Sequence, residues 1–259
     1  MQNTFLAEDL ASHGYIVVAL DHPYNGALVD TDAGVVASER LDAISAEKAP
    51  TAAALEAAWA KELAIWVADS RFVLDQLALM GQLGPDGSGM GFPWGTPRMD
   101  LTRVGAFGHS FGGATSMALL GADPRVKCAV NMDGWTLNGM ATRTTQPVLF
   151  VYEKVAGVRL PPVNVETQVD AADNAAVDES LANYGGLRAF VAGSQHLDFT
   201  DQTLVSPLPR LTHTGPIKGE RIREITRGLV LGFFDEELKG TGQVPAYPEV
   251  KMESFRGAR

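Results

Sequence analysis

Cysteine and basic residues are both scarce in this 259-residue chain. The one cysteine, Cys128, excludes an intrachain disulfide framework and argues against a thiolate-rich metal site. Lys and Arg total 21 against 31 Asp and Glu, which gives a formal net charge of -10. A surface with this balance does not attract phosphates, so we expect neither a nucleic-acid partner nor binding to an anionic membrane.

The chain also lacks a basic N-terminus and long hydrophobic runs. The first Lys or Arg is Arg40, so no secretory signal is present as written. The apolar runs at 16–20, 148–152 and 229–234 are far shorter than the roughly 20 residues that cross a bilayer. We therefore expect a soluble protein without membrane insertion. It is expected to be cytoplasmic, or secreted if an upstream segment is missing.

Hydrophobic residues make up 46% of the chain, enough for one sizeable core, so a single domain is expected over residues 1–259. Short apolar runs alternate with segments of helical period, which predicts an α/β fold with a mostly parallel sheet and flanking helices. The predicted strands are Tyr15–Leu20, Val104–Gly108, Cys128–Met132, Pro147–Glu153 and Leu187–Gly193. The predicted helices are Phe5–Ser12, Thr51–Met80, Gly112–Leu120, Ala171–Tyr184 and Gly219–Leu238.

The sharpest local motif is Gly-His-Ser-Phe-Gly at residues 108–112, where the predicted strand Val104–Gly108 runs into a helix. A Gly-x-Ser-x-Gly sequence between a strand and a helix is typical of a nucleophile elbow. Glycines two residues before and after Ser110 let the strand and the helix approach each other. The motif predicts Ser110 as a catalytic nucleophile.

A serine nucleophile needs a base, and the chain has five histidines. His196 follows the last predicted strand and lies after Ser110 in the chain, as the base does in this architecture. His109 lies inside the elbow, where we expect it to point away, and His13 lies in a turn before Gly14. Both are expected to be structural. His22 ends the first predicted strand, where it could line the pocket floor or be a satisfied loop histidine.

The base in turn needs a carboxylate that holds its tautomer. Asp133 and Glu153 each end a predicted strand, and both are candidates. Gly134 permits a sharp turn that would present Asp133 inward, whereas Lys154 after Glu153 indicates a solvated end. We therefore favour Asp133. Asp198 is expected to be a loop or helix-capping residue.

Four runs of the sequence resemble the plasma-type platelet-activating factor acetylhydrolases and their bacterial relatives, from about residue 5 to 240. The runs are 10–22, 108–113, 132–134 and 196–201. The resemblance implies a serine esterase of the α/β-hydrolase fold, with Asp133 as the acid and His196 as the base. It also implies that the backbone N–H of Phe111 is one oxyanion donor.

The N-terminal part of the sequence departs from the pattern of this family. Only four residues precede the predicted helix Phe5–Ser12, although such a sheet normally begins with strands upstream of it and takes its second oxyanion donor from a loop there. The N-terminal strands are therefore expected to be missing, which leaves Tyr15–Leu20 with a bare edge. A bare edge invites pairing, so we expect either a homo-oligomer or a lost upstream segment. We also expect slow turnover unless a backbone N–H near His22–Asn25 is the second donor.

Together these residues predict a carboxylic-ester hydrolase that acts through an acyl-enzyme and needs no metal or organic cofactor. The resemblance implies short-acyl esters, phospholipid acetyl esters or polyesters as substrates. Trp135, His22 and Tyr24 are expected to contact substrate. The alternative is a non-catalytic or very weakly active α/β-hydrolase-fold protein that lacks the oxyanion loop.

Overall fold

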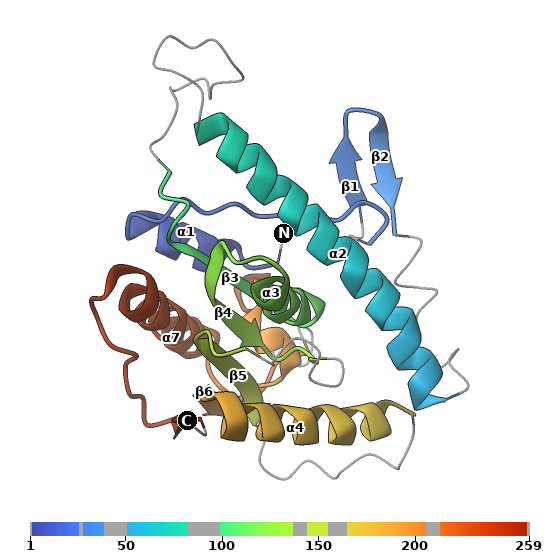
Figure 1. Cartoon of the computed structure of the whole chain (residues 1–259). Coiled ribbons are helices and arrows are strands. Elements are labelled where there is room, and N and C mark those ends of the chain that lie inside the picture. The colour runs from blue at the N-terminus through green and yellow to red at the C-terminus, as the bar shows by residue number, and fades with distance from the viewer. Residues whose placement is uncertain are drawn as a thin grey trace.

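The computed structural model describes residues 2–25, 28–38, 51–81, 99–136, 144–154, 165–205 and 213–257. Its centre is a five-stranded sheet, shown in Figure 1, in which the strands are neighbours in sequence order. The strands are β3 (Val104–His109), β4 (Val126–Met132), β5 (Val148–Lys154), β6 (Gly186–Ala192) and β7 (Val250–Phe255). The first four are parallel, and β7 is antiparallel to β6.

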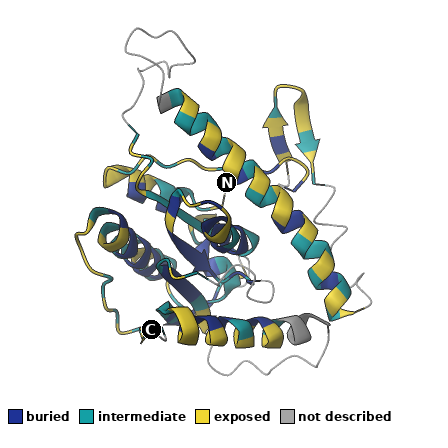
Figure 2. Ribbon diagram, in the orientation of Figure 1, coloured by how far each residue is buried: buried dark blue, intermediate teal, exposed yellow. Residues whose placement is uncertain are grey.

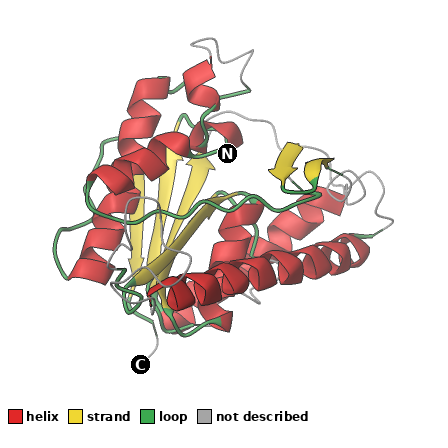
Figure 3. Cartoon of the chain, turned by 90° about the horizontal axis from the view of Figure 1, so that it is seen from above, coloured by secondary structure: helices red, strands yellow, loops and turns green. Residues whose placement is uncertain are grey.

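Helices cover both faces of this sheet, as Figure 3 shows. The longer helices are α1 (Thr4–Ser12), α2 (Ala52–Gly81), α3 (Phe111–Ala122), α4 (Val165–Tyr184) and α7 (Gly219–Lys239). The shorter elements are the hairpin β1 (Leu28–Thr31) and β2 (Gly34–Ala37), the 3-10 helix η2 (His196–Phe199) and α5 (Gln202–Val205). Among the described helices, none combines the length and apolar composition that a bilayer span needs.

Strand β4 is apolar at most positions because both faces of the sheet are covered at this strand. Cys128, Val130 and Met132 pack into the core shared with α1 and α7. Val126 and Ala129 pack instead into the core shared with α2, α3 and α4. Successive side chains of a strand point to opposite faces, so a strand covered on both faces is hydrophobic at nearly every position. Figure 2 shows the resulting buried centre and the exposed outer sides of the helices.

Four of the five predicted strands and all five predicted helices are confirmed, with shifted ends. The largest shift is in α4, which begins at Val165 rather than Ala171. Strand β7 and the β1–β2 hairpin were not predicted. Lys251 and Glu253 interrupt the apolar pattern of β7, which pairs only with β6 within the sheet. An edge strand with polar side chains gives little hydrophobic signal.

The prediction of a strand at Tyr15–Leu20 is wrong, because these residues form an extended segment with no strand pairing. Tyr15 and Val17 pack against the core, whereas Ile16 and Val18 are 54% and 42% exposed. This alternation has the period of a half-buried strand, but a strand also requires a hydrogen-bonded neighbour. The edge of the described sheet is therefore β3, not Tyr15–Leu20.

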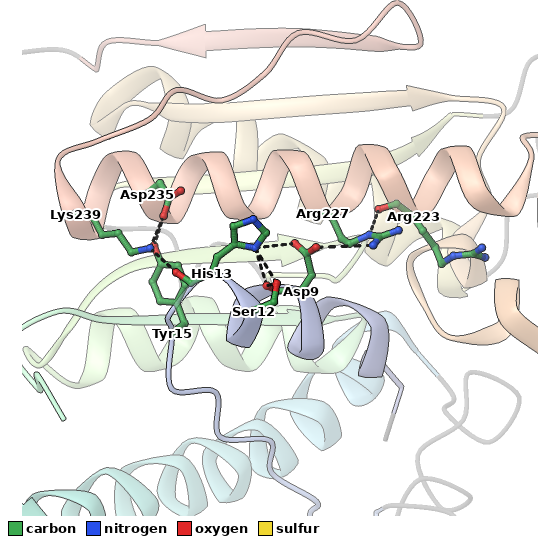
Figure 4. A network of polar contacts seen from close by, with 8 residues as sticks. All are labelled: Asp9, Ser12, His13, Tyr15, Arg223, Arg227, Asp235 and Lys239. Carbon is green, nitrogen blue, oxygen red and sulfur yellow. Dashed lines mark hydrogen bonds and ion pairs between the residues drawn. The ribbon is translucent and has the colours of Figure 1, made fainter. Parts of the chain in front are cut away.

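Polar contacts with α7 hold the segment that follows α1, as Figure 4 shows. The Tyr15 hydroxyl donates to Asp235 at 2.9 Å, and the Lys239 ammonium lies 2.8 Å from the same carboxylate. Lys239 also lies 3.9 Å from the centre of the Tyr15 ring. The Lys239 ammonium also donates to the His13 carbonyl oxygen at 3.1 Å. These contacts fix residues 13–15 against the C-terminal part of α7.

Candidate active site

The three residues expected to carry out catalysis all follow strands of the parallel part of the sheet. Ser110 comes directly after β3, Asp133 directly after β4, and His196 four residues after β6. The carboxyl ends of parallel strands meet at one edge of a sheet, where α/β proteins place their ligand sites. The topology therefore places Ser110, Asp133 and His196 at the same edge of the sheet.

Ser110 occupies a strained turn between β3 and α3. Its φ of 55° and ψ of -122° are rare for a residue with a side chain. A Cβ on Gly108 would collide with the backbone of Gly112, so the glycines allow the close approach of strand and helix. The Ser110 N–H donates to the Met132 carbonyl at 2.9 Å, which ties the turn to β4. Its hydroxyl does not cap α3.

Asp133 and His196 form a close acid–base pair. His196 Nδ1 lies 2.7 Å from Asp133 Oδ2, and the Asp133 side chain is only 10% exposed. The other carboxylate oxygen accepts the Glu153 backbone N–H at 3.0 Å. We assign the proton to Nδ1 because its partner is a carboxylate, which leaves a lone pair on Nε2 that can accept a proton.

The pKa of His196 is raised from its ordinary value of 6.5. Burial alone would lower it, but the hydrogen bond and negative charge of Asp133 outweigh burial, and the charge of Glu153 adds to the increase. These groups favour the imidazolium form. A proton taken from a nucleophile would be stabilised on this ring.

Glu153, the competing carboxylate, lies next to the pair but does not hold the imidazole. Burial, followed by the charge of Asp133, raises the pKa of Glu153, and the nearby backbone N–H of His196 opposes that shift. The structure thus brings Asp133 to the ring and Glu153 to the main chain of the same histidine.

The Asp133 turn is packed directly on the nucleophile turn. Asn131, which is fully buried, donates to the Gly134 carbonyl at 2.9 Å and accepts the Gly134 N–H at 2.8 Å. A Cβ on Gly134 would collide with the carbonyl oxygen of Ser110. Asp133 itself has a φ of 57°, so the turn depends on these contacts.

Helix α4 anchors the two residues that follow this turn. Trp135 Nε1 donates to Asp170 at 2.6 Å. Thr136 donates to Asp173 from both its backbone N–H and its hydroxyl, each at 2.7 Å. The expected pocket residue Trp135 is therefore held in one orientation.

Aromatic rings from α2 reach the site, and the sequence prediction missed their role. Trp59 stacks on Trp135 with ring centres 4.0 Å apart. Trp66 meets the Phe111 ring edge-on at 4.8 Å. The available signal was the seven-residue spacing of Trp59 and Trp66, which places both on one helical face.

His22 joins this aromatic group, whereas Tyr24 is more exposed. The His22 ring stacks on Trp66 at 3.9 Å, and its Nδ1 lies 2.7 Å from Asp69. His22 is 8% exposed and Tyr24 is 40% exposed, with a φ of 69° at Tyr24. Trp66 thus contacts both the His22 ring and the Phe111 ring.

Phe111 is the first residue of α3. The first N–H groups of a helix have no carbonyl acceptor within it, so this N–H can serve as an oxyanion donor. In the turn expected to supply a second donor, the Asn25 N–H already donates to the His22 carbonyl at 3.1 Å. Within the described residues, no group of three or more His, Cys, Asp or Glu side chains is placed to bind a metal.

Two further residues lie behind the base. Asp198, which is fully buried, accepts the N–H groups of Gln195 and Gly215 at 2.8 and 2.6 Å, as expected of a capping residue. The expectation that His109 points away from the site is wrong. Its Nε2 lies 2.9 Å from the His196 carbonyl oxygen, and the two imidazole rings are 4.3 Å apart.

Comparisons with known proteins show similarity both in sequence and in structure. A platelet-activating factor acetylhydrolase from Canis lupus familiaris is 36% identical over 56 residues, which are 20% of this chain and 13% of that protein. One from Gallus gallus is 29% identical over 113 residues, or 42% of this chain and 24% of that protein. The chain thus aligns with a quarter or less of these relatives.

Among solved structures, a ferulic acid esterase from Streptomyces cinnamoneus superimposes with a TM-score of 0.68 at 27% identity. The match covers 96% of this chain and 68% of that one, and it confirms the α/β-hydrolase fold. The model of the family "Platelet-activating factor acetylhydrolase, isoform II" matches residues 96–239, which is more than half of the chain and includes Ser110, Asp133 and His196. The chain belongs to this acetylhydrolase family.

Proposed function

We propose that the chain is a serine carboxylic-ester hydrolase in which Ser110 is the nucleophile, His196 the base and Asp133 the residue that orients the base. The observation that carries the proposal is the 2.7 Å contact between His196 Nδ1 and Asp133. It lies at the same sheet edge as the strained turn of Ser110. Membership of a family of esterase-like hydrolases supports the same chemistry.

The reaction follows from these roles. Ser110 Oγ attacks the ester carbonyl carbon while His196 Nε2 takes the hydroxyl proton. The Phe111 N–H stabilises the oxyanion that forms. The tetrahedral intermediate then expels the alcohol, which receives the proton from His196. Water repeats the sequence on the acyl-enzyme and releases the carboxylic acid and free Ser110.

The substrate class belongs to the proposal, because the acetylhydrolases named above align with this chain over only a small part of their length. Short-acyl esters, including phospholipid acetyl esters, fit the family to which the chain belongs. Esters of aromatic acids fit the structural similarity to a ferulic acid esterase. They also suit the aromatic group of Trp59, Trp66, Phe111 and Trp135, since flat rings stack on such side chains. Polyesters remain a third class to be assayed.

The proposal is tested by hydrolysis of p-nitrophenyl acetate, p-nitrophenyl butyrate and methyl ferulate by the wild type and by Ser110→Ala. Wild-type turnover should exceed that of the variant by up to roughly a millionfold where chemistry limits the rate. Equal rates for the two proteins would instead favour the non-catalytic alternative. The ratio of kcat/KM between methyl ferulate and methyl butyrate, which share a leaving group, then assigns the acyl preference.

A further inference from the structure

His109 is a buried histidine that the acyl-transfer steps do not use. It lies between Gly108 and Ser110 in the nucleophile turn, is 6% exposed, and points to the loop that carries the base. Its Nε2 is 2.9 Å from the carbonyl oxygen of His196. The two rings are 4.3 Å apart and inclined at 48°. The residue before the nucleophile is thus bonded to the main chain of the base.

The chemistry of this contact fixes the tautomer of His109. A carbonyl oxygen only accepts hydrogen bonds, so Nε2 must carry the proton. Nδ1 is then an acceptor, and it is buried without a hydrogen-bond partner in the described part of the chain. Burial, with a smaller contribution from the nearby charge of His196, lowers the pKa of His109 to about 4. The ring is therefore neutral at the pH at which an imidazole base works.

The main chain of His196 is held by a polar contact from His109. Its carbonyl oxygen accepts the His109 hydrogen bond, and its N–H lies near the Glu153 carboxyl group. The His196 side chain itself is 44% exposed, so packing alone does not define its position. The direction of the ring depends on Asp133 at Nδ1 and on these main-chain contacts.

We propose that His109 is a positioning residue that couples the nucleophile turn to the base by holding the backbone carbonyl of His196. One peptide bond joins His109 to Ser110, so the hydrogen bond fixes His196 relative to the nucleophile. The inference rests on the proposed function of Ser110 and His196. It assigns His109 no contact with substrate.

A matched set of substitutions tests the hydrogen bond apart from packing. In His109→Gln the side-chain amide can place an N–H near the position of Nε2 and can still reach the His196 carbonyl. His109→Met has a similar length but has no donor. His109→Asn keeps an amide donor on a side chain that is one methylene too short. The Asn variant keeps the test valid if the Met variant does not fold.

Steady-state hydrolysis of p-nitrophenyl butyrate and thermal unfolding should be measured for all four proteins. We expect His109→Gln to retain kcat within about threefold, and His109→Met and His109→Asn to lose about tenfold or more. KM should change by less than about twofold, because His109 touches no substrate. Equal kcat losses in Gln and Met, or a Met variant within twofold of wild type, would overturn the proposal.

A second measurement does not depend on turnover. The proton between Asp133 and His196 gives a downfield signal in proton NMR, and its sharpness reports how well the ring is fixed. The signal should persist in His109→Gln and broaden or shift in His109→Met. If wild-type protein hydrolysed no ester, the proposed function would fail, yet this signal would still test the positioning. An unchanged signal in folded His109→Met would overturn it.

Discussion

The carboxylate of Asp133 lies 2.7 Å from Nδ1 of His196, although 63 residues separate the two in the chain. The contact forms because β4 and β6 are parallel strands of one sheet, so the loops after them meet at the same edge. Glu153 is the second-to-last residue of β5, the strand between β4 and β6, and within the described residues no hydrogen bond joins its carboxyl group to the imidazole. This difference between the two carboxylates leads to the first prediction.

Asp133→Asn should lower kcat by about 10,000-fold, because an amide no longer holds the Nδ1–H tautomer of His196. Glu153→Gln should cost much less, since the amide oxygen can still accept the His196 backbone N–H. Both variants conserve side-chain volume, and single-turnover rates on p-nitrophenyl acetate would compare them. A large loss for Gln and a small one for Asn would reverse the assignment of the acid.

The pH profile of kcat/KM should report the raised pKa of His196. Only neutral imidazole can accept the Ser110 proton, so the rate should rise with pH and level off above that pKa. The sequence alone predicts a midpoint near the ordinary imidazole value of about 6.5. The charge of Asp133 moves the expected midpoint above this value. A midpoint below 6.5 in buffers of constant ionic strength would contradict this account of the site.

Buried His109 should make stability depend on acid pH. Its folded pKa of about 4 lies below the ordinary imidazole value of 6.5, so between these values the unfolded chain binds more protons. Stability is then lost as the pH falls from 6.5 to 4, by about 3 kcal/mol for this group at 1.36 kcal/mol per pKa unit. The charges of His196 and Asp133, which face the His109 ring, are present both in the wild type and in a His109→Gln variant.

Urea unfolding of wild type and His109→Gln at pH 6.5 and 4.5 measures this contribution by difference. The variant should lose less stability than the wild type between these two pH values. A loss of the same size in both proteins would show that folding does not lower the pKa of His109.

Asn131→Leu should destabilise the fold, because Asn131 bonds both the N–H and the carbonyl of Gly134 in a fully buried turn. Two backbone groups would lose their partners, at roughly 1–3 kcal/mol each. We expect a fall of about 2–4 kcal/mol in the free energy of unfolding by urea. Thr102→Val, which removes an exposed hydroxyl from a contact with Asp100, is the control and should cost less than about 1 kcal/mol.

Local patterns in the sequence were enough to predict the nucleophile turn. Glycines around Ser110, an apolar strand before it and a helix after it are all encoded within about 20 residues. The long contact from Asp133 to His196 required parallel strands, which the alternation of strands and helices predicted. Both predictions rest on one property of the fold. The C-terminal ends of parallel strands lie at the same edge of the sheet, whatever the sequences of the loops that follow them.

The errors arose where the outcome depends on a distant partner. Tyr15–Leu20 has the alternation of a strand, but periodicity does not show whether a neighbouring strand is present. Trp59 and Trp66 lie on one face of α2, and the sequence does not indicate that this face meets Phe111 and Trp135. The direction of His109 likewise depends on a loop 87 residues away.

The most direct test of the central claim is covalent labelling with a serine-directed phosphonate, followed by peptide mass spectrometry and an assay of residual esterase activity. The proposed mechanism predicts one phosphonyl group per chain, located on Ser110, with activity falling in proportion to labelling. His196→Ala should label far more slowly, because the hydroxyl would lose its base. Labelling at another residue, or full esterase activity after complete labelling of Ser110, would contradict the claim.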